Sequence, residues 1–212
     1  MSGRGPRLVV AVGGVLVIIT TIVARSGSPG AVEVAVFRWF NDPPRVLGAM
    51  LALVDPLLRP VALALLIVVV VVLLALTRRA VFWRIVAAAS AAGALAYVFD
   101  NALKIVVDRG RPPAYLADVL FHGYPVDPRG TGFPSSHTAV AVAVVVGAWP
   151  WLSRPWRVGG VVVVAAIGLD RMYVGAHFPL DVLGGVGVGL LAGGIVLVLS
   201  PRLTRRTRTA VP

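Results

Sequence analysis

The sequence has no cysteine and few charged residues. Because none of the 212 residues is a cysteine, disulfides and thiolate metal sites are excluded. Charged residues make up only 14% of the chain and hydrophobic residues 58%, and the mean hydropathy is +0.90. A soluble domain of this length could not bury so much apolar surface. The composition therefore predicts an integral membrane protein.

Acidic residues are missing from one set of segments, and this absence predicts the orientation. The formal net charge is +11, which in a soluble protein would point to nucleic acid. Here the excess falls in the N-terminus, two short loops and the C-terminal tail, none of which contains an acidic residue. By the positive-inside rule these segments, with both termini, are cytoplasmic, and no nucleic-acid binding is expected. The arginines concerned are Arg4, Arg7, Arg78, Arg79, Arg84, Arg154, Arg157, Arg202, Arg205, Arg206 and Arg208.

Apolar runs predict a single all-α domain, residues 1–212, built as a bundle of six transmembrane helices. The predicted spans are residues 8–24, 61–76, 85–107, 138–152, 158–172 and 180–199. The first could also be a cleaved signal peptide, but its apolar run is longer than a usual signal core and further spans follow, so an uncleaved helix is favoured. Between the first two spans, Val32, Val36, Phe37 and Phe40, with Trp39 beside them, predict a short interfacial helix.

The stretch 130–137, which reads GTGFPSSH, marks the start of a helix. It leaves a polar loop of about thirty residues, a length at which a functional loop is expected, and enters the fourth apolar run. The first turn of a helix presents unpaired N–H groups and a positive dipole end, which favour an anion. Ser135 and Ser136 add hydroxyl groups, and His137 adds a proton carrier. Serines that only cap the helix would also explain this pattern.

Other polar residues fall near the ends of predicted spans on the same, extracytoplasmic side. Asp100 and Lys104 are one helical turn apart, and Arg111 follows the third span. Each cation could simply extend to the membrane interface. Three cations, two histidines and a helix N-terminus on one face nevertheless describe a site for a tetrahedral oxyanion. The remaining members are Arg171, His177 and Asp181.

These residues resemble the signatures of the type-2 phosphatidic-acid phosphatase superfamily. Lys104, six residues and Arg111-Pro112 are similar to the first signature, and Pro134 to His137 resembles the second. Arg171, five residues, His177, three residues and Asp181 resemble the third. There are two departures, because the family usually has glycine at Ser136 and serine at Asp170. A carboxylate at Asp170 should repel a phosphate unless it pairs with a neighbouring arginine.

The resemblance implies a role for each residue. His177 would be the nucleophile that forms a phosphohistidine, and Asp181 would accept its other ring N–H and fix the tautomer. His137 would protonate the leaving oxygen and later activate water. No metal or cofactor is implied, and the sequence offers no obvious carboxylate cluster for magnesium or histidine-carboxylate site for zinc. The implied phosphate-binding residues are Lys104, Arg111, Ser135, Ser136 and Arg171.

The expected substrate is a membrane lipid phosphate or pyrophosphate whose head group reaches the extracytoplasmic face. A polyprenyl pyrophosphate in a bacterial plasma membrane is the leading candidate, while phosphatidate, phosphatidylglycerophosphate and lipid A stay open. Two other classes remain: a protein that binds or transports a lipid phosphate without cleaving it, and a related vanadate-dependent peroxidase. The predicted spans disfavour the peroxidase. The sequence does not indicate an oligomeric state.

Overall fold

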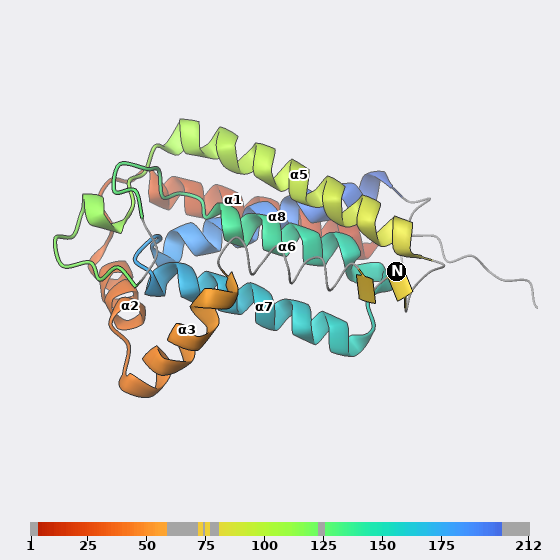
Figure 1. Cartoon of the computed structure of the whole chain (residues 1–212). Coiled ribbons are helices and arrows are strands. Elements are labelled where there is room, and N and C mark those ends of the chain that lie inside the picture. The colour runs from red at the N-terminus through yellow and green to blue at the C-terminus, as the bar shows by residue number, and fades with distance from the viewer. Residues whose placement is uncertain (1–3, 59–71, 74, 77–80, 123–125, 201–212) are drawn as a thin grey trace, which may run out of the picture.

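The computed structural model describes residues 4–58, 72–73, 75–76, 81–122 and 126–200. In these residues the secondary structure is helical, apart from one isolated β-bridge between Gly110 and Thr131. The all-α prediction is therefore confirmed for the described part of the chain. The elements are α1 (Arg4–Ala24), α2 (Ala31–Asn41), α3 (Arg45–Leu58), α5 (Phe82–Val107), η1 (Pro112–Ala114), α6 (Ser136–Ala148), η2 (Trp149–Trp151), α7 (Arg154–Tyr173) and α8 (Pro179–Leu199) (Figure 1).

Among the described residues, three helices, α1, α5 and α8, are long and apolar enough to cross a membrane, and they correspond to the first, third and sixth predicted spans. The predicted span 138–152 is the shorter helix α6 followed by the turn η2, which contains Pro150. The predicted span 158–172 falls within α7, whose two ends carry charged residues. The predicted span 61–76 lies almost entirely outside the described residues. The count of six spans therefore stays a prediction.

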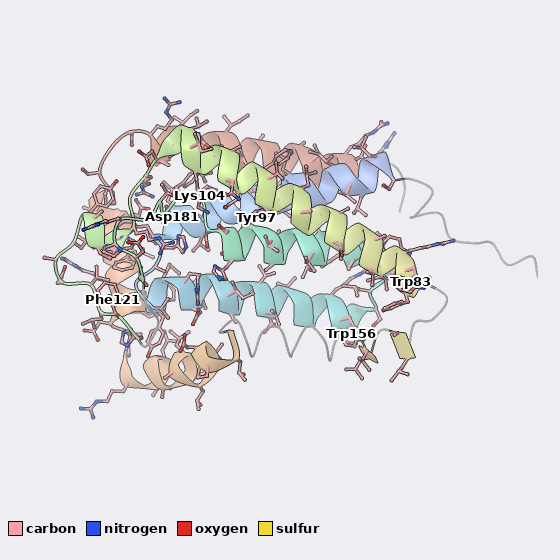
Figure 2. The ribbon with its side chains drawn as sticks, turned by 45° about the horizontal axis from the view of Figure 1, so that its top comes forward. Trp83, Tyr97, Lys104, Phe121, Trp156 and Asp181 are labelled. Carbon is pink, nitrogen blue, oxygen red and sulfur yellow. The ribbon has the colours of Figure 1, made fainter. Side chains whose placement is uncertain are left out.

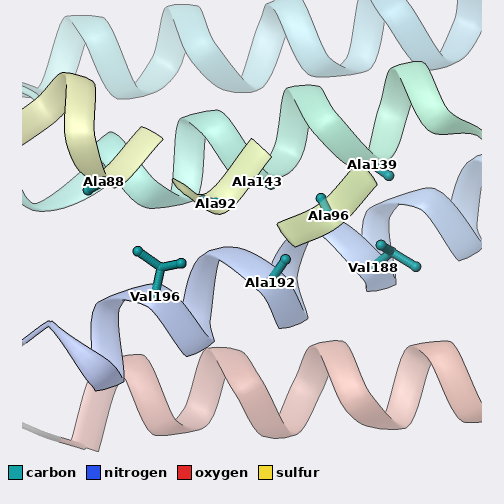
Figure 3. Close-up of a cluster of buried hydrophobic side chains, with 8 residues drawn as sticks. All are labelled: Ala88, Ala92, Ala96, Ala139, Ala143, Val188, Ala192 and Val196. Carbon is teal, nitrogen blue, oxygen red and sulfur yellow. The ribbon is translucent and has the colours of Figure 1, made fainter. Parts of the chain in front are cut away.

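Small residues form the contact between α5, α6 and α8. Alanines from α5 and α6 meet alanine and valine side chains of α8 in one buried cluster (Figure 3). Side chains this short let helix backbones approach closely, which is how helices associate where no water is displaced between them. The cluster consists of Ala88, Ala92, Ala96, Ala139, Ala143, Val188, Ala192 and Val196.

Glycines extend this close packing along two faces of α8. A Cβ on Gly189 would lie 2.6 Å from the carbonyl oxygen of Ala139 in α6. A Cβ on Gly194 would lie 3.0 Å from the backbone nitrogen of Val10 in α1. The first distance is too short for a real Cβ and the second is tighter than most, so these glycines let α8 pack closely against α6 and α1. Helix α8 is therefore packed closely between α1 and α6.

Helix α2 and the described parts of the loop between α5 and α6, residues 108–122 and 126–135, close one end of the bundle, opposite the α6–α7 turn (Figure 1). Phe37 of α2 is buried, and its ring lies 5.2 Å from that of Phe178. Asn41 ends the helix and fastens the loop to α7: its Nδ2 donates to the carbonyl oxygens of Leu120 and Tyr173, each at 2.8 Å. Helix α2 covers the residues for which an interfacial helix was predicted, while its place at a membrane surface stays a prediction.

Candidate active site

Backbone hydrogen bonds connect the stretch 130–137 to the residues just after α5 and to the start of α8. The Gly132 N–H donates to the carbonyl of Arg109 at 2.6 Å, and the Ser135 N–H donates to the carbonyl of Asp181 at 2.9 Å. A Cβ on Gly132 would lie 2.8 Å from the carbonyl oxygen of Gly110 and 3.1 Å from Oδ2 of Asp181. Only glycine fits between these two elements, and its backbone is brought against the residues of the third signature.

His177 is held in the tight turn between α7 and α8. Its backbone N–H donates to the carbonyl of Arg171 at 3.1 Å, in a turn that contains Gly175 with φ of +79°. The imidazole is buried, with Nδ1 2.8 Å from the carbonyl oxygen of Gly132 and 3.7 Å from Oδ2 of Asp181. Because a carbonyl only accepts, Nδ1 carries the proton in this contact and Nε2 keeps its lone pair. The hydrogen-bond partner at Nδ1 is thus the Gly132 carbonyl, and Asp181 stands further away than the resemblance implies.

The surroundings of His177 favour its neutral form. Burial lowers the pKa of His177 below its usual value, the negative charge of Asp181 opposes this shift, and the charges of Arg111 and Lys104 lower the pKa further. Desolvation penalises the imidazolium because its charge leaves water. A neutral imidazole is the form that can act as a nucleophile.

Asp181 is bound to Arg109, a residue that the sequence did not single out. Asp181 Oδ1 lies 3.0 Å from Arg109 Nη1, and its Oδ2 accepts the Phe178 N–H at 2.8 Å. Arg109 also forms two hydrogen bonds with Glu33 of α2, at 3.0 and 2.7 Å, and its guanidinium lies 5.1 Å from the centre of the Phe178 ring. This Glu33–Arg109–Asp181 network, in which Arg109 and Asp181 are buried and Glu33 is partly exposed, connects α2 to the first turn of α8.

Lys104 forms a compact cluster with Asp100 and Ser136. Its Nζ lies 2.5 Å from Asp100 Oδ2 and also donates to the hydroxyl of Ser136. Ser136 Oγ in turn donates to Asp100 Oδ2 at 2.6 Å. Asp100 is completely buried. Ser136 was predicted to bind substrate. In this structure its hydroxyl donates its hydrogen to Asp100.

Arg171 is paired with the unusual carboxylate beside it. Its Nε lies 3.0 Å from Asp170 Oδ2, its Nη2 donates to the same oxygen, and both residues are buried. The pairing that would make a carboxylate tolerable here is thus present. Arg111 is half-buried, and its Nε donates to the carbonyl of Thr131 at 3.4 Å. Gly130 leaves room for its guanidinium, since a Cβ there would lie 3.2 Å from Arg111 Cζ.

His137 and Ser135 lie at the start of α6. His137 is exposed and within electrostatic reach of Arg171, His177, Lys104 and Arg111. Ser135 occupies the N-cap position but makes no side-chain capping bond, and it accepts a hydrogen bond from Thr138 Oγ1 at 3.2 Å. Figure 2 shows Lys104 of α5 and Asp181 of α8 at the same end of the bundle. The predicted site residues all fall at this end.

An apolar groove of about 450 Å³ leads away from these residues between α6 and α7. Ser136, His137, Asp170 and Arg171 line it where it meets the site. Its volume lies in the range of ordinary ligand pockets. In the part of the chain that the structure describes, no group of three or more histidine, aspartate or glutamate residues could hold a metal ion. The apolar lining of the groove consists mainly of Val140, Ala141, Val144, Val163, Val164 and Ile167.

Comparison with known proteins identifies the family. The PAP2 superfamily pattern matches residues 84–205, which is more than half of the chain. This chain belongs to the PAP2 superfamily. The resemblance predicted from the three signatures is thereby confirmed, and the matched range contains every predicted site residue of this PAP2 protein.

Relatives and solved structures agree with the assignment to PAP2. Decaprenylphosphoryl-5-phosphoribose phosphatase of Mycobacterium tuberculosis is 33% identical over 112 residues, which are 51% of this chain and 57% of that protein. The match thus spans little more than half of that relative. The crystal structure of Aquifex aeolicus LpxE has 26% identity and a TM-score of 0.62, covering 79% of this chain and 96% of that one. A transmembrane PAP2 type phosphatidylglycerolphosphate phosphatase from Bacillus subtilis shares the fold, at 23% identity, a TM-score of 0.66 and coverage of 93% and 99%.

Proposed function

We propose that this PAP2 protein hydrolyses the phosphate ester or anhydride of a membrane lipid through a phosphohistidine at His177. The observation that carries the proposal is the buried His177 imidazole, whose Nδ1 contacts the Gly132 carbonyl at 2.8 Å. The positive charges of Lys104 and Arg111 lower the pKa of this imidazole. This arrangement supplies a nucleophilic nitrogen next to cations that suit phosphate oxygens.

The proposed reaction has two steps. Nε2 of His177 attacks phosphorus, the bond to the leaving oxygen breaks, and His137 gives that oxygen a proton. Water then loses a proton to His137 and attacks phosphorus, which releases phosphate and restores His177. Lys104, Arg111 and Arg171 would neutralise the charge that develops on the phosphoryl oxygens.

The groove between α6 and α7 supports a lipid substrate. Its apolar walls begin at Ser136 and His137, so a hydrocarbon chain lying in it would bring its phosphate to the proposed site. We propose a polyprenyl pyrophosphate as the substrate, because one relative is named a decaprenylphosphoryl-5-phosphoribose phosphatase and another, from Bacillus subtilis, an undecaprenyl-diphosphatase. Phosphatidate, phosphatidylglycerophosphate and lipid A are the alternatives within this activity, and binding or transport of a lipid phosphate without cleavage is the alternative to it.

A substrate panel scored by released phosphate tests this function. The purified chain in detergent should release phosphate from a polyprenyl pyrophosphate, with kcat/KM at least roughly tenfold above that for water-soluble p-nitrophenyl phosphate, because binding of the chain contributes to catalysis. Release should be unchanged by EDTA. No release from any lipid phosphate would instead favour a binding or transport protein, and loss of activity with EDTA would contradict the proposed reaction.

We further propose that the site faces the extracytoplasmic side of a bacterial plasma membrane, with both termini in the cytoplasm. The support is the arginine distribution, since Arg154 and Arg157 lie at the opposite end of the bundle from the described parts of the loop between α5 and α6.

Because the chain has no cysteine, single cysteines can report this orientation. Ala117→Cys, at an exposed position in the loop, should react with an impermeant thiol reagent in intact cells. Ser153→Cys, in the turn before α7, should react only after lysis. The reverse pattern would overturn the orientation.

A further inference from the structure

Two of the three cations proposed to bind phosphate each form an ion pair with an aspartate. Lys104 Nζ lies 2.5 Å from Asp100, and Arg171 Nε lies 3.0 Å from Asp170. Both carboxylates are completely buried. Arg111, the third cation, makes no ion pair among the described residues.

These carboxylates change the charge that the site offers to a phosphate. Asp181 shares Arg109 with Glu33, so this network adds no positive charge to the site. The remaining set has three positive charges, on Lys104, Arg111 and Arg171, and two negative ones, on Asp100 and Asp170, which leaves a single net positive charge. A phosphate monoester carries about −1.5 to −2 at neutral pH. The charge of this site is therefore smaller than that of the group it would bind.

The carboxylate of Asp100 is also fixed in place. Ser136 Oγ donates to its Oδ2 at 2.6 Å, in addition to Lys104, while Oδ1 has no hydrogen-bond partner among the described residues. A buried carboxylate with both donors on one oxygen would lose them if it turned away, which is costly. Asp100 is thus expected to stay beside Lys104 when a phosphate enters.

We propose that Asp100 and Asp170 are specificity-determining residues that weaken binding of the phosphate group itself. The two carboxylates repel an anion that approaches Lys104 and Arg171. Affinity for a lipid phosphate then comes mainly from its hydrocarbon chain in the α6–α7 groove, and free inorganic phosphate leaves the site readily. This inference rests on the proposed function, since it describes selectivity at that same site.

Neutral variants test the proposal on the purified full chain. Asp100→Asn and Asp170→Asn should each bind inorganic phosphate roughly tenfold more tightly, because one like charge is removed. The measurements are calorimetric titration with inorganic phosphate and its inhibition constant against lipid phosphate hydrolysis. The kcat for the lipid should fall as product release slows. Asp118→Asn, an exposed carboxylate paired with Arg38, is the matched control and should change neither value.

Unchanged or weaker phosphate binding in these variants would overturn the proposal. If only one variant folds, that variant decides. If neither folds, the carboxylates are structural counter-ions, and the proposal is wrong. A wild-type chain that cleaves no lipid phosphate would refute the proposed function, whereas the calorimetric comparison would still decide whether Asp100 and Asp170 weaken phosphate binding.

Discussion

Replacing His177 with alanine is expected to lower the rate of phosphate release by a factor on the order of 10⁴ or more, because the proposed intermediate forms on its imidazole. His177 contacts Gly132 through a single hydrogen bond, so the fold should survive the change. The measurements are phosphate release from a lipid phosphate and the melting temperature in detergent.

His122→Ala is the matched control for this variant. His122 stacks on Tyr173 at 4.1 Å and contacts the Asn41 carbonyl, so it has a structural partner and no place in the proposed reaction. It should keep most of its activity. Substantial residual activity in folded His177→Ala would remove His177 from the role of nucleophile.

Replacing Arg109 with methionine is expected to cost about 3 to 5 kcal/mol of stability, because Asp181 and Glu33 would lose the cation that compensates both. The side chain of Arg109 is only 2% exposed, and methionine can fill much of the same space. The measurements are the free energy of unfolding in detergent and the melting temperature. Activity should fall as well, since Asp181 Oδ2 lies 3.7 Å from His177 Nδ1.

Arg38→Met provides the comparison, because Arg38 also pairs with a carboxylate but in an exposed position. Exposed pairs contribute about 0 to 1 kcal/mol, so this variant should be nearly as stable as wild type. The double variant Arg109→Met with Glu33→Gln should be less destabilised than the sum of the single changes. Equal effects of Arg38→Met and Arg109→Met would contradict the importance of the buried network.

The sequence predicted the positions of the candidate site residues best where they lie at the ends of helices. Lys104 and Arg171 could be placed on one face because each apolar run ends near it, and helix geometry then determines where the side chain emerges. Charge repulsion led to the separate expectation that a carboxylate at Asp170 would repel a phosphate unless it paired with a neighbouring arginine, and Asp170 does pair with Arg171. The ends of the helices were less accurate: α1 begins at Arg4, four residues before the predicted start, because backbone hydrogen bonding does not require apolar side chains.

What the sequence could not provide were contacts between distant segments. Glu33 meets Arg109 across 76 positions, and neither residue belongs to a periodic pattern with the other. The partner of His177 Nδ1 is a backbone carbonyl, which every residue possesses and which therefore leaves no signal in the sequence. Ser136 and Asp100 were each visible, but their hydrogen bond depends on how far α6 is displaced along α5.

Because the site depends on how the helices are aligned along one another, the glycines of α8 affect it although they lie far from it. The proposed site draws side chains from the ends of α5, α6, α7 and α8, so it exists only while these helices keep one longitudinal alignment. Gly189 lies eight residues, or about 12 Å, along α8 from Asp181. Because its contact with Ala139 leaves no room for a side chain, a bulky residue there would slide or tilt α8 against α6. The geometry of phosphate chemistry is thus set partly in the interior of the bundle, by residues that never approach the substrate.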